Sequence, residues 1–91
     1  MIRLLYFSTA HANITQRDVD GLAAHAATKN KELGVTGALA FNGRNFCQVL
    51  EGPEDVVHRL VMTIKADNRH SGLKVLDEKE IDAPHFSDWS M

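Results

Sequence analysis

The sequence predicts a single α+β domain of order β-α-β-β-α-β, followed by the start of a fifth strand. This prediction rests on three observations. Residues 2–8 and 45–51 alternate in the way that half-buried strands do. Residues 19–33 and 56–64 repeat apolar side chains at helical spacing. Asn42-Gly43 stands between two apolar runs and is typical of a tight hairpin. This order is ferredoxin-like, with both helices on one face of a mixed or antiparallel sheet.

The first strand and the first helix cover residues 2–33. Residues 2–8 are apolar on both faces, which is typical of a central strand. Thr15 and Asp18 resemble a capping box, although Glu or Gln is the usual partner of the capping residue. Gly34 is expected to end the helix. The expected buried stripe of this helix consists of Val19, Leu22, Ala23, Ala26, Asn30 and Leu33.

The second half of the chain repeats this pattern. We expect a strand over residues 35–41, a type I′ turn with positive φ at both Asn42 and Gly43, and a strand over 45–51. Pro53 suits the first position of a helix that ends near Asp67. Residues 67–72 form a polar connection. A fourth strand is expected from residue 73, fading towards residue 81, and the fifth opens at residue 88 and is cut short at residue 91.

Composition limits the function classes. The 91 residues form one domain, 1–91, with ten basic and twelve acidic side chains and a net charge of −2. This balance argues against a nucleic-acid partner, which favours a basic face. No apolar run is long enough to span a bilayer, so no membrane partner is expected. The single cysteine, Cys47, fits a reducing compartment and hence a cytoplasmic protein. We expect Cys47 to be a buried, inert thiol, and the spacing of the five histidines indicates no metal site.

Three polar side chains are predicted to lie on buried faces. Tyr6 and Gln48 alternate with apolar neighbours on the two central strands, and Asn30 lies on the apolar stripe of the first helix. An amide buried without a partner costs roughly 1–3 kcal/mol, so each of these groups needs one. Two readings stay open: a satisfied polar cluster in which Tyr6 bonds Gln48, or the wall of a site for a polar ligand.

With these residues in place, the chain resembles the BLUF family of blue-light sensors that use FAD. The resemblance extends over all 91 residues, and its motifs occur in one order at the family's spacing. The motifs are Leu5-Tyr6, Asn30 followed by Val35-Thr36-Gly37-Ala38-Leu39, Phe46-Cys47-Gln48-Val49-Leu50-Glu51-Gly52, Asp67-Asn68-Arg69-His70 and Phe86-Ser87-Asp88-Trp89-Ser90-Met91.

The resemblance implies FAD, or FMN or riboflavin in its place, bound non-covalently between the helices. It implies that Tyr6 is the photoactive electron and proton donor. Gln48 would bridge the Tyr6 hydroxyl and the flavin edge, and Asn30 would hold the pyrimidine side of the ring. It further implies that Arg69 and His70 lie near the ribityl and phosphate side. Trp89 and Met91 would relay the change outwards to an output partner or a C-terminal segment.

Two departures from the family pattern bear on function. Lys29 stands where many members have a second polar flavin contact. Of a substitute contact and a solvated helix residue, we favour the solvated residue. The fifth strand is short, so the outward-facing side chains are expected to be partly uncovered, which suggests self-association into a homo-oligomer, a missing C-terminal segment, or both. These side chains are Arg3, Leu5, Phe7, Cys47 and Val49.

The main alternative is a non-photoactive ferredoxin-like module that binds flavin or single-stranded nucleic acid. Nucleic-acid modules of this fold place aromatic side chains on the open face of the central strands. Phe7 is suitable, but Cys47 and Val49 offer no stacking surface. An acylphosphatase-like enzyme would need a glycine-rich loop after the first strand, and residues 8–13 contain no glycine. We therefore expect a sensor domain and not an enzyme.

Overall fold

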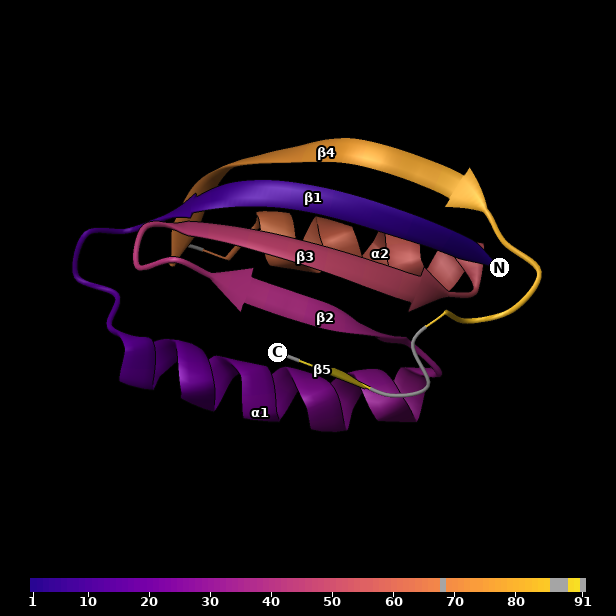
Figure 1. The fold of residues 1–91 in the computed structure, drawn as a ribbon, viewed down its shortest axis with the longest axis horizontal. Coiled ribbons are helices and arrows are strands. Elements are labelled where there is room, and N and C mark those ends of the chain that lie inside the picture. The colour runs from indigo at the N-terminus through magenta and orange to yellow at the C-terminus, as the bar shows by residue number, and fades with distance from the viewer. Residues whose placement is uncertain (68, 86–88, 91) are drawn as a thin grey trace.

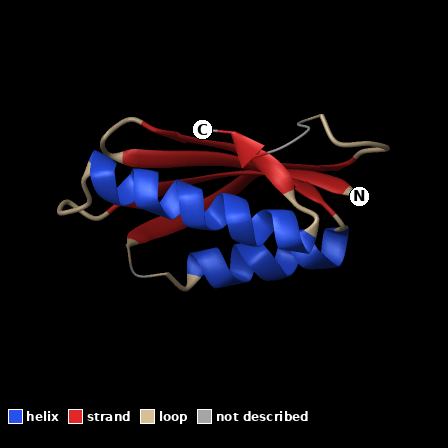
Figure 2. Ribbon diagram, turned by 90° about the horizontal axis from the view of Figure 1, so that it is seen from below, coloured by secondary structure: helices blue, strands red, loops and turns tan. Residues whose placement is uncertain are grey.

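The structure is a computed structural model that describes residues 1–67, 69–85 and 89–90. Two helices pack on one face of a five-stranded sheet, and within these residues the opposite face carries no helix (Figures 1 and 2). The elements in chain order are β1 (Ile2–Ala10), α1 (Gln16–Leu33), β2 (Thr36–Phe41), β3 (Asn45–Gly52), α2 (Glu54–Lys65), β4 (His70–Glu80) and β5 (Trp89–Ser90).

The strand order is β4-β1-β3-β2-β5, which puts β1 and β3 at the centre of the sheet. β1 is antiparallel to both of its neighbours, and β2 is antiparallel to β3. β5 runs parallel to its neighbour and pairs with Gly37 and Ala38 of β2. The ferredoxin-like α+β prediction is therefore confirmed, including the mixed sheet and the shared face of the helices.

Local sequence signals explain the position of α1. The Thr15 hydroxyl accepts from the backbone N–H of Asp18 at 3.2 Å, and the Asp18 carboxylate accepts from the Thr15 N–H at 3.0 Å. This reciprocal pair is the predicted capping box. Gly34 ends the helix at φ 75°, a left-handed conformation that suits glycine. The prediction was wrong for Leu33, the last residue of the helix, which is 40% exposed.

The hairpin between β2 and β3 differs from the predicted type I′ turn. Gly43 has φ 92°, but Asn42 is not among the residues with positive φ. Instead, the Asn42 side-chain oxygen accepts hydrogen bonds from the backbone N–H groups of Arg44 and Asn45, at 3.0 and 2.8 Å. An asparagine that bonds the backbone two and three residues on makes its own turn, so a positive φ at Asn42 is not needed.

Two strand boundaries also differ from the prediction. β1 extends to Ala10 rather than ending at residue 8, and β4 begins at His70, inside the predicted polar connection. The two extensions pair with each other, since Ala10 lies opposite His70. Backbone pairing with a central strand thus outweighed the polar composition of residues 70–72. Asp88 and Met91, where the fifth strand was expected to open and end, lie outside the described residues.

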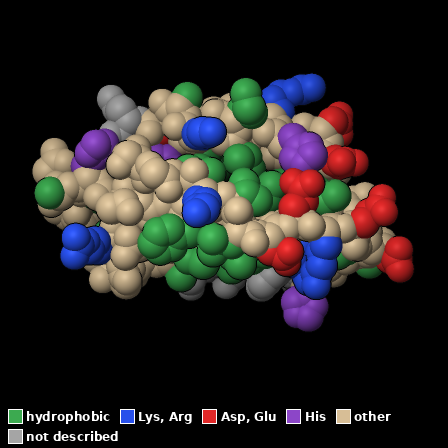
Figure 3. Space-filling view, turned by 90° about the horizontal axis from the view of Figure 1, so that it is seen from above, with side chains coloured by type: hydrophobic (Ala, Val, Ile, Leu, Met, Phe, Trp, Pro, Cys, Tyr) green, Lys and Arg blue, Asp and Glu red, His purple; other side chains and the backbone are tan. Residues whose placement is uncertain are grey.

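The helix face of the sheet holds the core, and the outward face is partly uncovered. Leu4 and Leu50 are fully buried beneath α2, together with Val57. On the outward face Phe7 is 37% exposed, and Leu5 and Val49 are half-buried, as predicted. Cys47 is exposed, which agrees with the expected uncovered face and shows that the prediction of a buried thiol was wrong. In the described part of the chain no helix covers this face. Viewed from the β4 edge, hydrophobic side chains gather along the middle and acidic ones at the end where β4 finishes (Figure 3).

One charged group on the outward face is nevertheless fully buried. The Glu51 carboxylate accepts from the Arg3 Nε at 2.8 Å and from the backbone N–H of His85 at 2.7 Å. These contacts attach the connection after β4 to the centre of the sheet. Buried carboxylates need such partners, because an isolated buried charge is very costly.

The structure brings together three exposed side chains of metal-ligating types, a cluster that the histidine spacing did not reveal. Glu54, His58 and Glu78 place one ligand atom each within 4.8 Å of one another. His58 Nε2 and a Glu78 carboxylate oxygen are 2.7 Å apart, so this pair ties α2 to β4. Among the described residues, no helix combines the length and the apolar character needed to cross a membrane.

Candidate functional site

A cavity of about 310 Å³ lies between the two helices and the sheet. Its volume falls at the small end of the range of roughly 300–1,000 Å³ found for ligand pockets. Apolar groups from all three elements form much of its wall, among them Leu22, Leu39 and Leu60. The polar groups of the wall are Tyr6, His25, Lys29, Asn30, Gln48, Thr63, Asp67, Arg69 and His70.

The sheet wall of the cavity carries a bonded pair of polar side chains. β1 and β3 place Tyr6 and Gln48 on the helix face, where both are buried. The Tyr6 hydroxyl donates to Gln48 Oε1. With that oxygen facing Tyr6, the Gln48 amide nitrogen makes no hydrogen bond within the described part of the chain. The Tyr6 hydroxyl and Gln48 Oε1 are therefore satisfied by each other, and the Gln48 amide nitrogen still has hydrogens to donate.

Asn30 approaches the same cavity from α1. Its backbone carbonyl accepts from Val35 N–H at 2.8 Å in the turn that ends the helix, which fixes this residue at the helix terminus. Only 3% of the residue is exposed. Among the residues that the structure describes, the Asn30 amide has no hydrogen-bond partner. An amide that lines a cavity and has no protein partner is available to a polar ligand.

The surroundings of Tyr6 keep its hydroxyl protonated. Burial raises the pKa of Tyr6 well above its usual range, and Cys47 and the Asp67 carboxylate add to the shift in the same direction. The phenol therefore remains a hydrogen-bond donor across the physiological pH range. A tyrosine of this kind releases its proton only together with an electron or to a strong acceptor.

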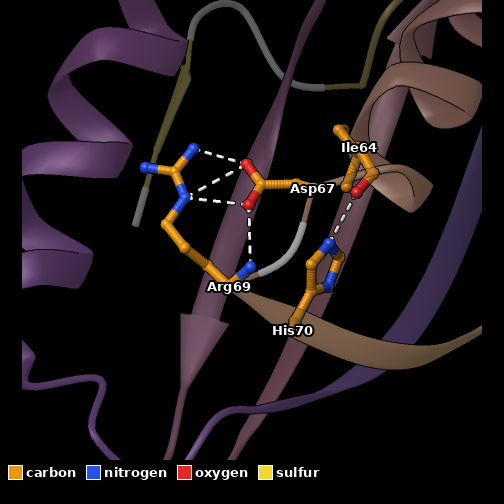
Figure 4. A network of polar contacts seen from close by, with 4 residues as sticks. All are labelled: Ile64, Asp67, Arg69 and His70. Atoms are coloured by element: carbon orange, nitrogen blue, oxygen red, sulfur yellow. Dashed lines mark hydrogen bonds and ion pairs between the residues drawn. The ribbon is translucent and has the colours of Figure 1, made fainter.

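A second polar network lies at the end of α2, where the chain turns into β4 (Figure 4). The Asp67 carboxylate accepts from the backbone N–H of Arg69 at 2.9 Å and from the Arg69 guanidinium through Nε and Nη2. These charge-assisted bonds lower the pKa of Asp67 to about 2. Arg69 is thus held by its neighbour two residues earlier, with 48% of its side chain exposed.

His70 lies deeper than the sequence predicted. Its Nε2 is 2.6 Å from the Ile64 carbonyl oxygen, and its Nδ1 is 2.7 Å from the Ser8 hydroxyl. A carbonyl oxygen only accepts, so Nε2 carries a proton and donates it to Ile64. Both ring nitrogens are used inside the protein, so the ring of His70 offers the cavity its carbon edge.

The structure thus brings five of the seven predicted site residues to one cavity: Tyr6, Asn30, Gln48, Arg69 and His70. Of the other two, Trp89 pairs through its backbone with Gly37, and Met91 lies outside the described residues. Lys29 is exposed, as expected, but it also borders the cavity.

Sequence reasoning missed three polar members of the wall, His25, Thr63 and Asp67. The available signal for Asp67 was its position two residues before Arg69 in a polar turn, where an aspartate can bond the backbone. His25 precedes Lys29 by one helical turn and therefore shares its side of α1.

Comparison with known proteins identifies the family. The family model described as "Sensors of blue-light using FAD" matches residues 1–91. The chain belongs to the BLUF family. As a BLUF domain it is a flavin-binding sensor of blue light.

The relatives are longer proteins. The chain is 36% identical over 67 residues to the blue light- and temperature-regulated antirepressor BluF of Escherichia coli K12, covering 74% of the chain and 17% of that relative. It is 35% identical over 92 residues to photoactivated adenylate cyclase subunit alpha of Euglena gracilis, covering 98% of the chain and 9% of the relative. The chain thus spans less than a fifth of the length of these curated relatives.

Solved BLUF structures share the whole fold. The BLUF domain of BlrP1 superimposes with a TM-score of 0.88 at 35% identity, over 98% of this chain and 62% of that one. The dark-state structure of BlrB, a BLUF protein, superimposes with a TM-score of 0.90 at 33% identity, over 97% and 67%.

The cavity of this BLUF domain suits a flavin ring. Flavin rings are flat and largely apolar, with nitrogen and oxygen atoms along one edge. The cavity offers Leu22, Leu39 and Leu60 for the apolar part, and the unpartnered amide of Asn30 and the amide nitrogen of Gln48 for the polar edge. Mostly apolar walls with a few convergent polar groups are the usual composition of cofactor sites.

Proposed function

We propose that this domain binds FAD non-covalently between α1 and α2 and responds to blue light by switching the hydrogen bonds of Tyr6 and Gln48. The observation that supports this most is the bonded Tyr6–Gln48 pair, which faces the unpartnered Asn30 amide across one cavity. The flavin would supply the absorption of blue light and the acceptor for an electron. The proton transfer and the change of hydrogen bonds would be carried out by side chains of the protein.

In this proposal Tyr6 and Gln48 are the photoactive residues. Tyr6 donates an electron and its hydroxyl proton after excitation, and Gln48 passes the proton on through its amide. Rotation or tautomerisation of the Gln48 amide then exchanges donor and acceptor towards the flavin edge. The return of the electron and the proton leaves no chemical product, only a rearranged set of hydrogen bonds. Such a rearrangement can shift the balance between two conformations of the sheet.

The remaining cavity residues would hold the cofactor. Asn30 is placed at the pyrimidine side of the ring, because a side-chain amide matches its alternating donors and acceptors. Arg69 would lie near the phosphate, and the ring edge of His70 near the ribityl chain. FAD is the proposed cofactor, with FMN or riboflavin as possible replacements, since the ring contacts are common to all three.

The output of the switch would lie on the outward side of the sheet. We propose that Trp89 and Met91 relay the change to an output partner, and that the domain has no enzymatic activity of its own. The relatives named as adenylate cyclases and as an antirepressor indicate that partners differ within the family. Self-association through the outward face and a cytoplasmic location complete the proposal. Light scattering in darkness and under blue light tests the self-association.

The test of the proposal is a dark-minus-light absorption spectrum. The purified chain should be yellow, its flavin bands should shift to the red under blue light, and the shift should reverse in darkness. A chain that binds flavin without any shift would instead be the non-photoactive binding module. A colourless chain that takes up no flavin would overturn the proposal. No nucleic-acid binding is expected, given the net charge of −2.

A further inference from the structure

A second cavity adjoins the first at Arg69. It has a volume of about 510 Å³ and shares the side chains of Leu22, His25 and Arg69 with the first cavity. Its remaining wall comes from the start of α1 and the loop before it, including Arg17 and Asp18. A ligand whose ring lies between the helices can therefore extend past Arg69 into this second space.

The charges around the second cavity favour an anionic group. Arg17 and Arg69 bring two guanidinium groups to its wall. The Asp18 carboxylate also borders it, but that carboxylate is bonded to the backbone N–H of Thr15 in the helix cap. FMN and FAD carry phosphate groups beyond the ribityl chain, whereas riboflavin ends in a hydroxyl. Arginine recognises phosphate through paired N–H donors. This cavity should therefore favour flavins with a phosphate, FMN and FAD, over riboflavin.

Arg69 is not free to bind a phosphate, because Asp67 already occupies its guanidinium. Two nitrogens of the guanidinium donate to the two Asp67 carboxylate oxygens. This arrangement has the fork geometry that arginine forms with phosphate. The pair is open to solvent, with 48% of the Arg69 side chain and 27% of the Asp67 side chain exposed. Ion pairs as exposed as this one contribute little free energy, so another anion can readily replace the Asp67 carboxylate.

We propose that Asp67 sets how strongly the site prefers phosphorylated flavins to riboflavin, by competing with the flavin phosphate for Arg69. This inference rests on the proposed flavin site. A phosphate must displace the Asp67 carboxylate from Arg69, and riboflavin need not. Asp67 therefore weakens the binding of FMN and FAD but leaves that of riboflavin unchanged. Its removal should widen the difference between the two classes of flavin.

Asp67→Asn tests the idea with little change in local structure. The Asn side-chain oxygen can still accept from the Arg69 backbone N–H, so the turn into β4 is kept while the charge is lost. The full chain is equilibrated at fixed ionic strength with FMN and riboflavin at equal concentrations, each in excess over the protein. The ratio of the two flavins retained by the protein is then measured by chromatography. This ratio is independent of how much of the protein is active.

We expect Asp67→Asn to raise the retained FMN-to-riboflavin ratio about 2- to 5-fold, the range given by an ion pair of 0.5–1 kcal/mol. Arg69→Gln should lower the ratio below that of the unaltered chain. The double variant Asp67→Asn/Arg69→Gln should match Arg69→Gln alone, because Asp67 acts through Arg69. Asp77→Asn and Arg59→Gln remove the same charges from exposed positions outside both cavities and should leave the ratio unchanged.

An unchanged ratio in Asp67→Asn would overturn the inference. So would a rise of equal size in the Arg69→Gln background, because Asp67 would then repel the phosphate directly instead of competing for Arg69. Both of these outcomes leave flavin binding intact, and with it the proposed function. Failure of every variant and of the unaltered chain to retain either flavin would overturn the proposed function together with this inference.

Discussion

Tyr6 stands directly opposite Gln48 in the antiparallel pairing of β1 with β3, and its hydroxyl donates to the Gln48 side-chain oxygen. The contact is therefore built into the register of the two central strands. If either strand slipped by one residue, its member of the pair would turn to the outward face. The adjacent pair Leu4 and Leu50 is fully buried under α2 and holds this register.

Tyr6→Phe should abolish the light-induced red shift while keeping the fold and the flavin. The change removes the hydroxyl that donates to Gln48 and leaves the ring in the core. Dark-minus-light absorption spectra measure the shift, and the flavin content is read from the same spectra. Ser71→Ala removes a hydroxyl from an exposed position of β4 and should behave like the unaltered chain. A normal red shift in Tyr6→Phe would exclude Tyr6 from the photoreaction.

Asn30→Ala should have opposite effects on flavin binding and on the stability of the flavin-free chain. Without flavin, the Asn30 amide makes no hydrogen bond to the described part of the protein, and alanine favours the helix more than asparagine does, so the change should raise the free energy of unfolding by about 0.5–1 kcal/mol. With flavin, the loss of its hydrogen bonds should weaken binding about 10-fold. Urea unfolding and flavin titration measure the two effects.

Thr28→Ala is the matched control for Asn30→Ala. It lies on the exposed side of the same helix and gains the same helix-favouring residue, but it does not border the cavity. Its flavin affinity should be unchanged. If Asn30→Ala bound flavin as tightly as this control, Asn30 would have no contact with the ring.

Gly37→Ala should destabilise the fold by about 2–4 kcal/mol. A Cβ on Gly37 would lie 2.0 Å from the Val49 carbonyl oxygen of β3, and a backbone atom in a central strand cannot move aside cheaply. Gly21→Ala is the counterpart, because a Cβ there meets nothing within 4 Å. In the interior of α1 it should stabilise by about 0.5–1 kcal/mol. Thermal unfolding compares the two, and equal effects would contradict the packing argument.

The Asp67–Arg69 pair should stabilise the flavin-free chain only above acidic pH. The pKa of Asp67 is lowered from 3.8 to about 2 in the folded state, so its contribution is complete above pH 4 to 5 and disappears as the pH falls through 2. Because the pair is exposed, we expect about 0.5–1 kcal/mol.

Urea unfolding of the unaltered chain and of Asp67→Asn at pH 6, 4 and 2 measures the stabilisation contributed by the Asp67–Arg69 pair. The unaltered chain should be the more stable at pH 6, and the difference should vanish by pH 2. Asp77→Asn should change the free energy of unfolding by less than about 0.5 kcal/mol at each pH. A difference for Asp67→Asn that persists at pH 2 would assign the effect to packing instead of charge.

The local elements could be predicted because their signals are local. The alternation around Gln48, the Thr15–Asp18 cap and the stop at Gly34 each act over a few residues, and each is confirmed. The errors occur where a distant partner decides the outcome. His70 joins β4 because β1 supplies backbone partners, and its ring is buried by Ser8 and Ile64. Cys47 is exposed because none of the described helices covers the outward face.

The sequence by itself determined that Tyr6, Gln48 and Asn30 face inwards, since strand and helix periodicity places them there. It left open whether they form a satisfied cluster or the wall of a site. Only the tertiary structure decided this point: β1 and β3 bring Tyr6 and Gln48 into contact, while α1 holds Asn30 across a cavity without a partner. The physical reason is that a hydrogen bond needs its groups within about 3 Å, and such distances between separate elements are set by packing.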